Sequence, residues 1–287
     1  MSRVTDDGSQ KFFSKAIQNI SMKSQQRTYL LSTKVYGDTD KPQVVLLHGI
    51  ATSSIIWQDT IRLLSQDYQV VTIDLLGHGK SPKPDDVAYT TELHADSIAH
   101  TLQARTLNTK SVFVGFSIGA LITAKLAAKY PDLASSAMLI APPVYATRTA
   151  DSLGVIDTAY RRAYTYIERL PKAQSLKTIE KVQQNMPRLI GKNVFNEHTW
   201  HPIMSSLRHT VQNQSIHTDI VNIDPKIPIT ILYGSLDHLV IRKRVEQLAR
   251  LNPTTNIKRV LAPHGITQNY SQSISKLLFN TTATQPI

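Results

Sequence analysis

Short hydrophobic runs recur along the chain at intervals that suit alternating strands and helices. The run Val44–Leu47 is apolar at every position, as expected of a strand that is buried on both faces of a parallel sheet. Further runs of this kind predict strands at Gln69–Gly77, Ser111–Val114, Ser136–Ala141, Ile227–Gly234 and Asn256–Ala262. Ahead of them, Arg27–Gly37 predicts one strand of an antiparallel edge.

Amphipathic stretches lie between these runs. Thr91–Leu107 places Leu93, Ile98 and Leu102 at helical spacing and begins with residues that cap helices well. Strands that alternate with helices in this way are typical of α/β folds. We therefore predict an α/β fold with a mostly parallel sheet flanked by helices.

The alternation stops after Pro142 and resumes only after Leu207. Three helical patterns follow one another there, at Asp157–Leu170, Ser175–Met186 and Asn196–Val211. We interpret residues 142–207 as a helical cap inserted into a core that comprises residues 1–141 and 208–287. Most aromatic side chains of the cap are expected to pack against the core, and Tyr160, Tyr164 and Trp200 are the candidates for lining a substrate pocket.

The segment Gly115-Phe116-Ser117-Ile118-Gly119 joins the predicted strand Ser111–Val114 to a helical stretch. A serine on such a sharp strand-to-helix turn has strained backbone angles, and its neighbours two positions away must be small because strand and helix pass close together. The turn holds the serine hydroxyl above the carboxyl end of the sheet. It also places the Ile118 amide at a helix N-terminus, where it can stabilise a developing negative charge.

A serine hydroxyl needs a base to take its proton, and the base is usually a histidine oriented by a carboxylate. Asp237 follows one buried strand and His264 follows the next, so both loops leave the same edge of a parallel sheet as Ser117. The chain order serine, aspartate, histidine suits this arrangement. We expect His238, beside Asp237, to lie on the wrong loop for a base.

A second donor to the developing oxyanion is expected after the strand Val44–Leu47. Gly49 lets the backbone approach a substrate and leaves the Ile50 amide free to donate, together with that of Ile118. We expect His48 to fix this loop by hydrogen bonding rather than to react, and Asp74 with the turn that follows it to form a scaffold.

Composition narrows the range of functions. The 287 residues include no cysteine, which excludes disulfides and thiolate metal sites, and we predict neither a metal nor a cofactor. The net charge is +11, but the basic residues are spread without the glycine and aromatic pattern of RNA-binding modules, so no nucleic-acid partner is predicted. An acidic protein partner stays open, because Pro143 to Leu207 holds nine Lys/Arg against five Asp/Glu.

The beginning of the sequence carries Asp6 and Asp7 and no apolar core of the signal-peptide kind. No segment reaches the roughly 18 apolar residues that a membrane span requires. These observations predict a cytoplasmic protein without a membrane span.

Together these motifs resemble the α/β-hydrolase fold superfamily, in its capped esterase-like branch. The resemblance extends from Val44 to Phe279 and rests on LLHGIATSSIIW, DLLGHGKS, GFSIGA, YGSLDHLV and APHG. It implies Ser117 as nucleophile, Asp237 as acid, His264 as base, and the Ile50 and Ile118 amides as the oxyanion hole. The chain departs from many relatives at Ala120 and Pro263, where they carry glycine.

The expected function is that of a serine hydrolase that cleaves a small-molecule carboxylic ester through an acyl-enzyme. A thioesterase, a lactonase, a carbon–carbon bond hydrolase and a cofactor-free perhydrolase are alternatives on the same residues. A serine nucleophile argues against the branches of this superfamily that use an aspartate there. A different class of function, a receptor that uses the pocket without catalysis, is the remaining alternative.

Overall fold

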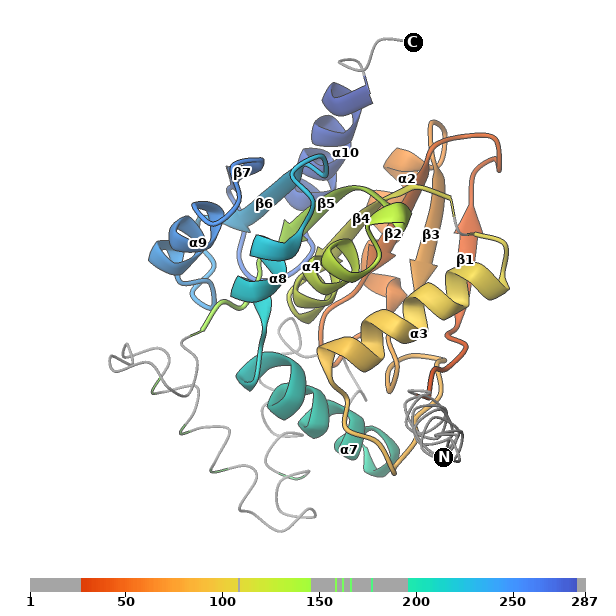
Figure 1. Cartoon of the computed structure of the whole chain (residues 1–287), viewed down its shortest axis with the longest axis vertical. Coiled ribbons are helices and arrows are strands. Elements are labelled where there is room, and N and C mark those ends of the chain that lie inside the picture. The colour runs from red at the N-terminus through yellow and green to blue at the C-terminus, as the bar shows by residue number, and fades with distance from the viewer. Residues whose placement is uncertain are drawn as a thin grey trace, which may run out of the picture.

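A computed structural model describes residues 27–107, 109–145 and 196–282, together with the isolated positions 158, 162, 166 and 177. Within these residues, seven strands form one sheet in the order β1-β3-β2-β4-β5-β6-β7 (Figure 1). Only β1 runs antiparallel to its neighbour β3, and all other neighbouring strands are parallel. The strands are β1 (Thr33–Tyr36), β2 (Gln43–Leu47), β3 (Gln69–Ile73), β4 (Ser111–Phe116), β5 (Ala134–Ile140), β6 (Ile229–Gly234) and β7 (Thr255–Val260).

The hydrophobic runs lie where they were predicted, and the α/β fold is confirmed. Every residue of β2 and β3 is buried, because helices cover both faces of the sheet. The edge strand β7 contains no buried residue, and β1 at the other edge is also partly exposed.

Helices cover the two faces of the sheet. In the view of Figure 1, α3, α4 and α8 lie in front of it, and α2 and α10 lie behind it and contact each other. The helices and shorter helical turns of the described residues are η1 (Ser54–Trp57), α2 (Gln58–Leu64), α3 (Thr91–Ala104), α4 (Ile118–Lys129), η2 (Pro131–Leu133), α7 (Glu197–Ser206), the π-helical turn η3 (Leu207–Gln212), α8 (Ile216–Asn222), α9 (Arg242–Ala249) and α10 (Gln268–Thr282).

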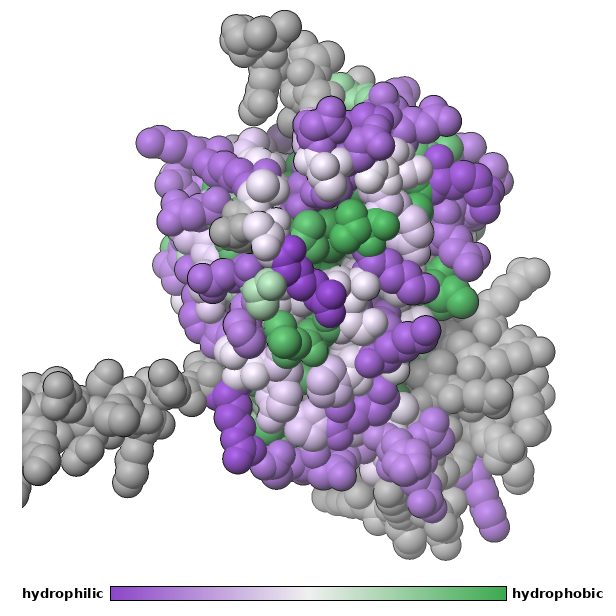
Figure 2. All heavy atoms as spheres, turned by 90° about the vertical axis from the view of Figure 1, so that its right-hand side faces the viewer, coloured by the Kyte–Doolittle hydropathy of each residue, from purple (hydrophilic) through white to green (hydrophobic). Residues whose placement is uncertain are grey.

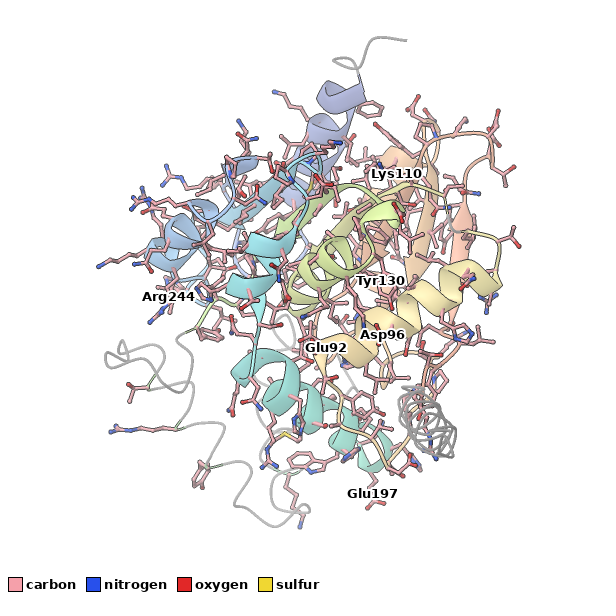
Figure 3. The ribbon with its side chains drawn as sticks, viewed as in Figure 1. Glu92, Asp96, Lys110, Tyr130, Glu197 and Arg244 are labelled. Atoms are coloured by element: carbon pink, nitrogen blue, oxygen red, sulfur yellow. The ribbon has the colours of Figure 1, made fainter. Side chains whose placement is uncertain are left out.

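Ionic contacts join the three helices of the front layer. Lys125 on α4 lies 2.8 Å from the Glu92 carboxylate on α3 and 2.6 Å from that of Asp219 on α8. Further along the same helices, the Tyr130 hydroxyl donates to Asp96 at 2.7 Å (Figure 3). Because the Lys125 and Asp219 side chains are largely buried, this pairing compensates the cost of removing both charges from water.

The helix α7 packs directly on the turn that follows β3. A Cβ atom at Gly77 would lie 2.5 Å from Pro202 of α7, so only glycine permits this approach. The Tyr89 amide donates to the Ser205 hydroxyl at 3.1 Å, and Tyr89 O accepts from the Thr210 hydroxyl of η3 at 2.8 Å. The predicted helix Asn196–Val211 is therefore present as α7 and η3, fastened to the core.

The rest of the predicted cap falls on residues 146–195, which lie outside the described residues except at four isolated positions. The helices predicted at Asp157–Leu170 and Ser175–Met186, and the division of the chain into a core and the cap 142–207, therefore remain predictions.

Three histidines are buried in the core: His48, His78 and His94. His48 and His78 lie with their ring centroids 5.5 Å apart, and His94 lies 6.0 Å from the ring of Tyr89. Burial lowers the pKa of His48 and His94 to about 3 and that of His78 to about 4. All three imidazoles are therefore neutral in the folded protein at neutral pH.

We predict that the free energy of unfolding falls as the pH drops below about 6.5, the pKa of an unperturbed histidine. The unfolded chain then binds protons at these three imidazoles while the folded chain does not. Each such proton contributes a slope of about 1.4 kcal/mol per pH unit, so the three approach about 4 kcal/mol per unit between about pH 5 and pH 6. Urea unfolding at a series of pH values measures this slope.

His94→Leu removes one of the three groups and should reduce the slope by about a third. An unchanged slope in a folded His94→Leu variant would show that this imidazole does not remain neutral in the native state.

Candidate active site

Ser117 occupies a strained turn between β4 and α4. Its backbone has φ 54° and ψ −116°, a conformation that residues other than glycine rarely adopt. The Ser117 amide donates to Ile140 O of β5 at 2.8 Å, and α4 begins at the next residue. The predicted sharp strand-to-helix turn is therefore present, with the serine at its apex.

The two glycines of the motif are required by the close approach of the surrounding backbone. A Cβ atom at Gly115 would lie 2.1 Å from Gly119 O, and one at Gly119 would lie 2.5 Å from Leu47 O of β2. No side chain fits at either position without separating α4 from the sheet.

Asp237 and His264 come together from the loops after β6 and β7. His264 Nδ1 lies 2.7 Å from Asp237 Oδ2, and Asp237 Oδ1 accepts a hydrogen bond from the Leu239 amide at 2.9 Å. The Asp237 side chain is fully buried, whereas 18% of the His264 side chain is exposed. With Nδ1 facing the carboxylate, Nε2 of His264 is the ring nitrogen left for a reacting group.

His264 packs against the residue that precedes Ser117. The His264 ring lies 5.0 Å, centroid to centroid, from the ring of Phe116, the residue that precedes the serine. No hydrogen bond joins the Ser117 hydroxyl to His264 in this structure. His238 follows Asp237 in the sequence and is exposed.

The loop after β2 approaches the serine closely. A Cβ atom at Gly49 would lie 2.9 Å from the Phe116 ring and 3.4 Å from Ser117 Cβ. Ile50 follows Gly49 and therefore comes close to the turn, and Ile118, the second expected donor, begins α4 directly after Ser117. Both amides that were predicted as oxyanion donors thus belong to segments that meet at Ser117.

His48 holds this loop through both of its ring nitrogens. Nδ1 lies 2.7 Å from Gly49 O, and Nε2 accepts from the Leu75 amide at 2.9 Å. Because Nε2 accepts, the proton of the neutral ring is on Nδ1 and is donated to Gly49 O. The prediction that His48 fixes the loop by hydrogen bonding is confirmed.

Asp74, directly after β3, fixes the turn that follows this strand in a similar way. Its Oδ1 accepts from the Ser54 amide and its Oδ2 from the Lys80 amide, at 2.8 and 2.9 Å. A Cβ atom at Gly79 would lie 2.2 Å from Oδ2, so the turn can close on the carboxylate only with glycine there. The predicted scaffold role of this segment is confirmed.

One residue near the site was not anticipated. Tyr270 of α10 is fully buried, and a Cβ atom at Gly234 would lie 3.1 Å from its hydroxyl. Burial, and secondly the charge of Asp237, raises the pKa of Tyr270. No local motif marks this residue, because its position depends on how α10 returns across the sheet.

The predicted pocket residues are only partly accounted for. Trp200 is half-buried on α7, whereas Tyr160 and Tyr164 lie outside the described residues. Among the residues that the structure describes, no group of three or more histidine and acidic side chains is placed to hold a metal ion. Nor does that part of the chain include a helix long and apolar enough to span a bilayer.

Known proteins share this architecture. The chain is 37% identical over 113 residues to a protein named "Probable lysophospholipase BODYGUARD 4" from Arabidopsis thaliana, a match that covers 38% of this chain and 27% of that one. It is 27% identical over 218 residues to a 2-(acetamidomethylene)succinate hydrolase from Mesorhizobium japonicum, covering 74% and 77% of the two chains. The chain thus spans about a quarter of the length of the plant protein and most of the bacterial one.

Solved structures agree on the fold. The enol-lactonase from Burkholderia xenovorans LB400 superimposes with a TM-score of 0.70 at 16% identity, covering 88% of this chain and 96% of that one. The model of the "alpha/beta hydrolase fold" family matches residues 42–265, which include the serine turn, Asp237 and His264. Because this match covers most of the chain and the sheet has the corresponding strand arrangement, the protein belongs to the α/β hydrolase family of enzymes.

Proposed function

We propose that this enzyme is a serine hydrolase that cleaves carboxylic esters through an acyl-enzyme intermediate. The observation that carries the proposal is the hydrogen-bonded pair of His264 and buried Asp237, 2.7 Å apart, with His264 packed against the residue that precedes a serine of φ 54°. This combination of a strained hydroxyl, an oriented imidazole and a buried carboxylate suits nucleophilic acyl transfer.

In the first half of the reaction, the Ser117 oxygen attacks the ester carbonyl carbon and His264 Nε2 takes the hydroxyl proton. Substrate binding tightens the contact between serine and histidine, which is often loose in a free enzyme. Asp237 stabilises the imidazolium that forms and holds Nδ1 as the donor. The carbonyl oxygen becomes an oxyanion, which accepts hydrogen bonds from the Ile50 and Ile118 amides.

The tetrahedral intermediate then collapses. The bond to the alcohol oxygen breaks, His264 returns its proton to that oxygen, and the acyl group stays on Ser117. A water molecule, deprotonated by His264, attacks the acyl-enzyme in the same way and releases the carboxylic acid.

The names of the similar proteins support ester chemistry. Lysophospholipases and enol-lactonases both break bonds between an acyl carbon and an oxygen, which is the bond that this arrangement would cleave. A thioesterase, a carbon–carbon bond hydrolase and a cofactor-free perhydrolase would use the same residues. A screen of esters of graded acyl length, with thioesters and lactones alongside, separates these possibilities.

We also propose that residues 142–207 cap the site and that Tyr160, Tyr164 and Trp200 line its pocket. The close packing of α7 on Gly77 supports a fixed position for the end of this segment, because Pro202 leaves no space between helix and turn. Caps of variable sequence set pocket shape, so substrate choice is expected to depend on this segment.

We predict that a fluorophosphonate probe labels Ser117 and that Ser117→Ala abolishes the labelling. The strained turn exposes the hydroxyl to the probe, and the helix N-terminus stabilises the anionic adduct. Mass spectrometry of the digested protein locates the label. Ser235→Ala is the control, because Ser235 is exposed near Asp237 but lies outside the turn; label on Ser235 with Ser117 unmodified would contradict the assignment.

The three triad members should differ in importance. Ser117→Ala and His264→Ala should each reduce kcat/KM by about 10⁴-fold or more, and the double variant little further, because the two groups act as a unit. Asp237→Asn should leave a small residual rate. Turnover of a p-nitrophenyl ester measures all of these, with circular dichroism to verify folding.

His238→Ala is the matched control for the base and should retain activity. If a folded His238→Ala variant lost activity while His264→Ala kept it, the base would be wrongly assigned. Absence of turnover on every ester, thioester and lactone by a folded wild-type protein would favour a receptor instead.

His48→Phe should reduce kcat by between about tenfold and 10³-fold while KM changes little. The variant removes the donor that holds Gly49 O, so the Ile50 amide is no longer fixed toward the oxyanion, which exists only after attack. His48→Asn keeps a donor and should recover part of the rate. A loss of thermal stability in His48→Phe with kcat unchanged would restrict His48 to a role in folding.

A further inference from the structure

Exposed leucines project from the two loops that carry Asp237 and His264. Leu236 is 53% exposed and Leu261 is 67% exposed, although both lie within three residues of a predicted catalytic side chain. Leu239 on the first loop is 37% exposed. The Leu236 amide donates to Ala262 O at 3.1 Å, so the two loops lie side by side and their leucines share one end of the sheet.

Basic residues follow or precede these leucines closely in the sequence. From residue 238 to residue 282 the chain has seven Lys/Arg and only one acidic residue, Glu246, which pairs with Arg242 at 2.7 Å. Arg242 and Lys243 start α9 directly after the Asp237 loop, so they lie at the same end of the sheet as the leucines. Arg259 is exposed on β7 two residues before Leu261. Both α9 and β7 lie at the side of the molecule opposite β1 (Figures 1 and 3).

The position of these charges is unfavourable for the fold itself. The first turn of α9 contains three basic residues and no acidic one, although a helix N-terminus carries partial positive charge. Glu246 compensates Arg242 one turn further along the helix, whereas the structure gives Lys243 no hydrogen bond or ion pair with the described residues. Lys243 is therefore available to a negatively charged partner outside the chain.

We propose that the surface formed by Leu236, Leu239, Leu261, Arg242, Lys243 and Arg259, the docking face, binds to a lipid bilayer that contains anionic lipids. The basic side chains would attract the charged headgroups, and the leucines would enter the interface between headgroups and acyl chains. Separate leucines at loop ends suit a fluid interface, whereas an apolar partner helix would require a groove. A bilayer bound here would bring the loops of Asp237 and His264 to the lipid surface.

Vesicle sedimentation of the full chain tests the proposal without any assumption about the reaction. One set of vesicles contains phosphatidylcholine alone, and the other contains one part phosphatidylserine to two parts phosphatidylcholine. We expect at least about tenfold tighter binding to the anionic vesicles, and weaker binding as the salt concentration rises, because screening reduces the attraction between surface charges.

Two double variants probe the two components of the docking face. Arg242→Glu with Lys243→Glu should weaken binding to the anionic vesicles by at least about tenfold, because both headgroup contacts become repulsive. Leu236→Ser with Leu261→Ser should also weaken it, and more so at high salt, where apolar insertion supplies most of the affinity. Circular dichroism and thermal melting verify that both variants are folded.

Matched controls come from the opposite edge of the sheet. Lys34→Glu with Lys80→Glu makes the same change in net charge, and Leu30→Ser with Val35→Ser removes two exposed apolar side chains, 52% and 44% exposed. The face that carries β1 is seen in Figure 2, where hydrophobic patches are small and separated by hydrophilic side chains. Both controls should bind the anionic vesicles as the wild type does.

The proposal is overturned if the wild type binds neither kind of vesicle, or if the docking-face and control variants weaken binding equally. If the wild type does not bind vesicles but binds an acidic protein through Arg242 and Lys243, the docking face is a binding site for a protein partner instead. Ester turnover is measured in parallel in solution without vesicles, so a failure of the proposed reaction and a failure of membrane binding are distinguishable.

Discussion

The close crossing of β4 and α4 at Ser117 is the constraint on which the rest of the site depends. Backbone atoms occupy the space that a side chain at Gly115 or Gly119 would need. Because both residues are glycine, the chain can turn from strand to helix within one residue. That residue then has a positive φ angle, which costs about 1–3 kcal/mol and persists only where the surroundings enforce it. The hydrogen bond from the Ser117 amide to Ile140 O and the largely buried helix α4 supply that enforcement.

Buried polar groups then fix the loops around the serine. His48 bonds with both ring nitrogens, and Asp74 accepts two backbone amides, so the segments after β2 and β3 are joined by side chains rather than by strand pairing. Hydrogen bonds of this kind hold their partners in one geometry because leaving either group unpaired in the interior is costly. This arrangement depends on pH, because the His48 imidazole must stay neutral for Nε2 to accept the hydrogen bond from the Leu75 amide.

Charge is distributed unevenly over the molecule. Around α4, cations are neutralised by carboxylates of neighbouring helices, as with Lys125 between Glu92 and Asp219. Around α9, Glu246 pairs with Arg242, but it is the only acidic residue from residue 238 to residue 282, and exposed leucines lie there near Asp237 and His264. The first arrangement balances its charges within the fold, whereas the second combines an excess of basic residues with exposed apolar side chains. Basic residues and exposed leucines thus occur together at the end of the sheet where the site lies.

Local patterns in the sequence were enough to predict the strands, the serine turn and the chain order of Ser117, Asp237 and His264. These features depend on local periodicity and on residue types that a tight turn demands, and both can be recognised without knowing the fold. The sequence also indicated that His48 holds its loop, because a histidine directly after a buried strand has backbone groups within reach.

Contacts between residues far apart in the sequence could be found only from the folded chain. The approach of Phe116 to His264, the position of Tyr270 behind Gly234 and the packing of Pro202 against Gly77 join segments tens of residues or more apart. The same holds for the leucines of the docking face, since Leu236 and Leu261 become neighbours only through the hydrogen bond between their loops. Such contacts are set by how helices return across the sheet, and no local pattern of hydrophobic and polar residues encodes that geometry.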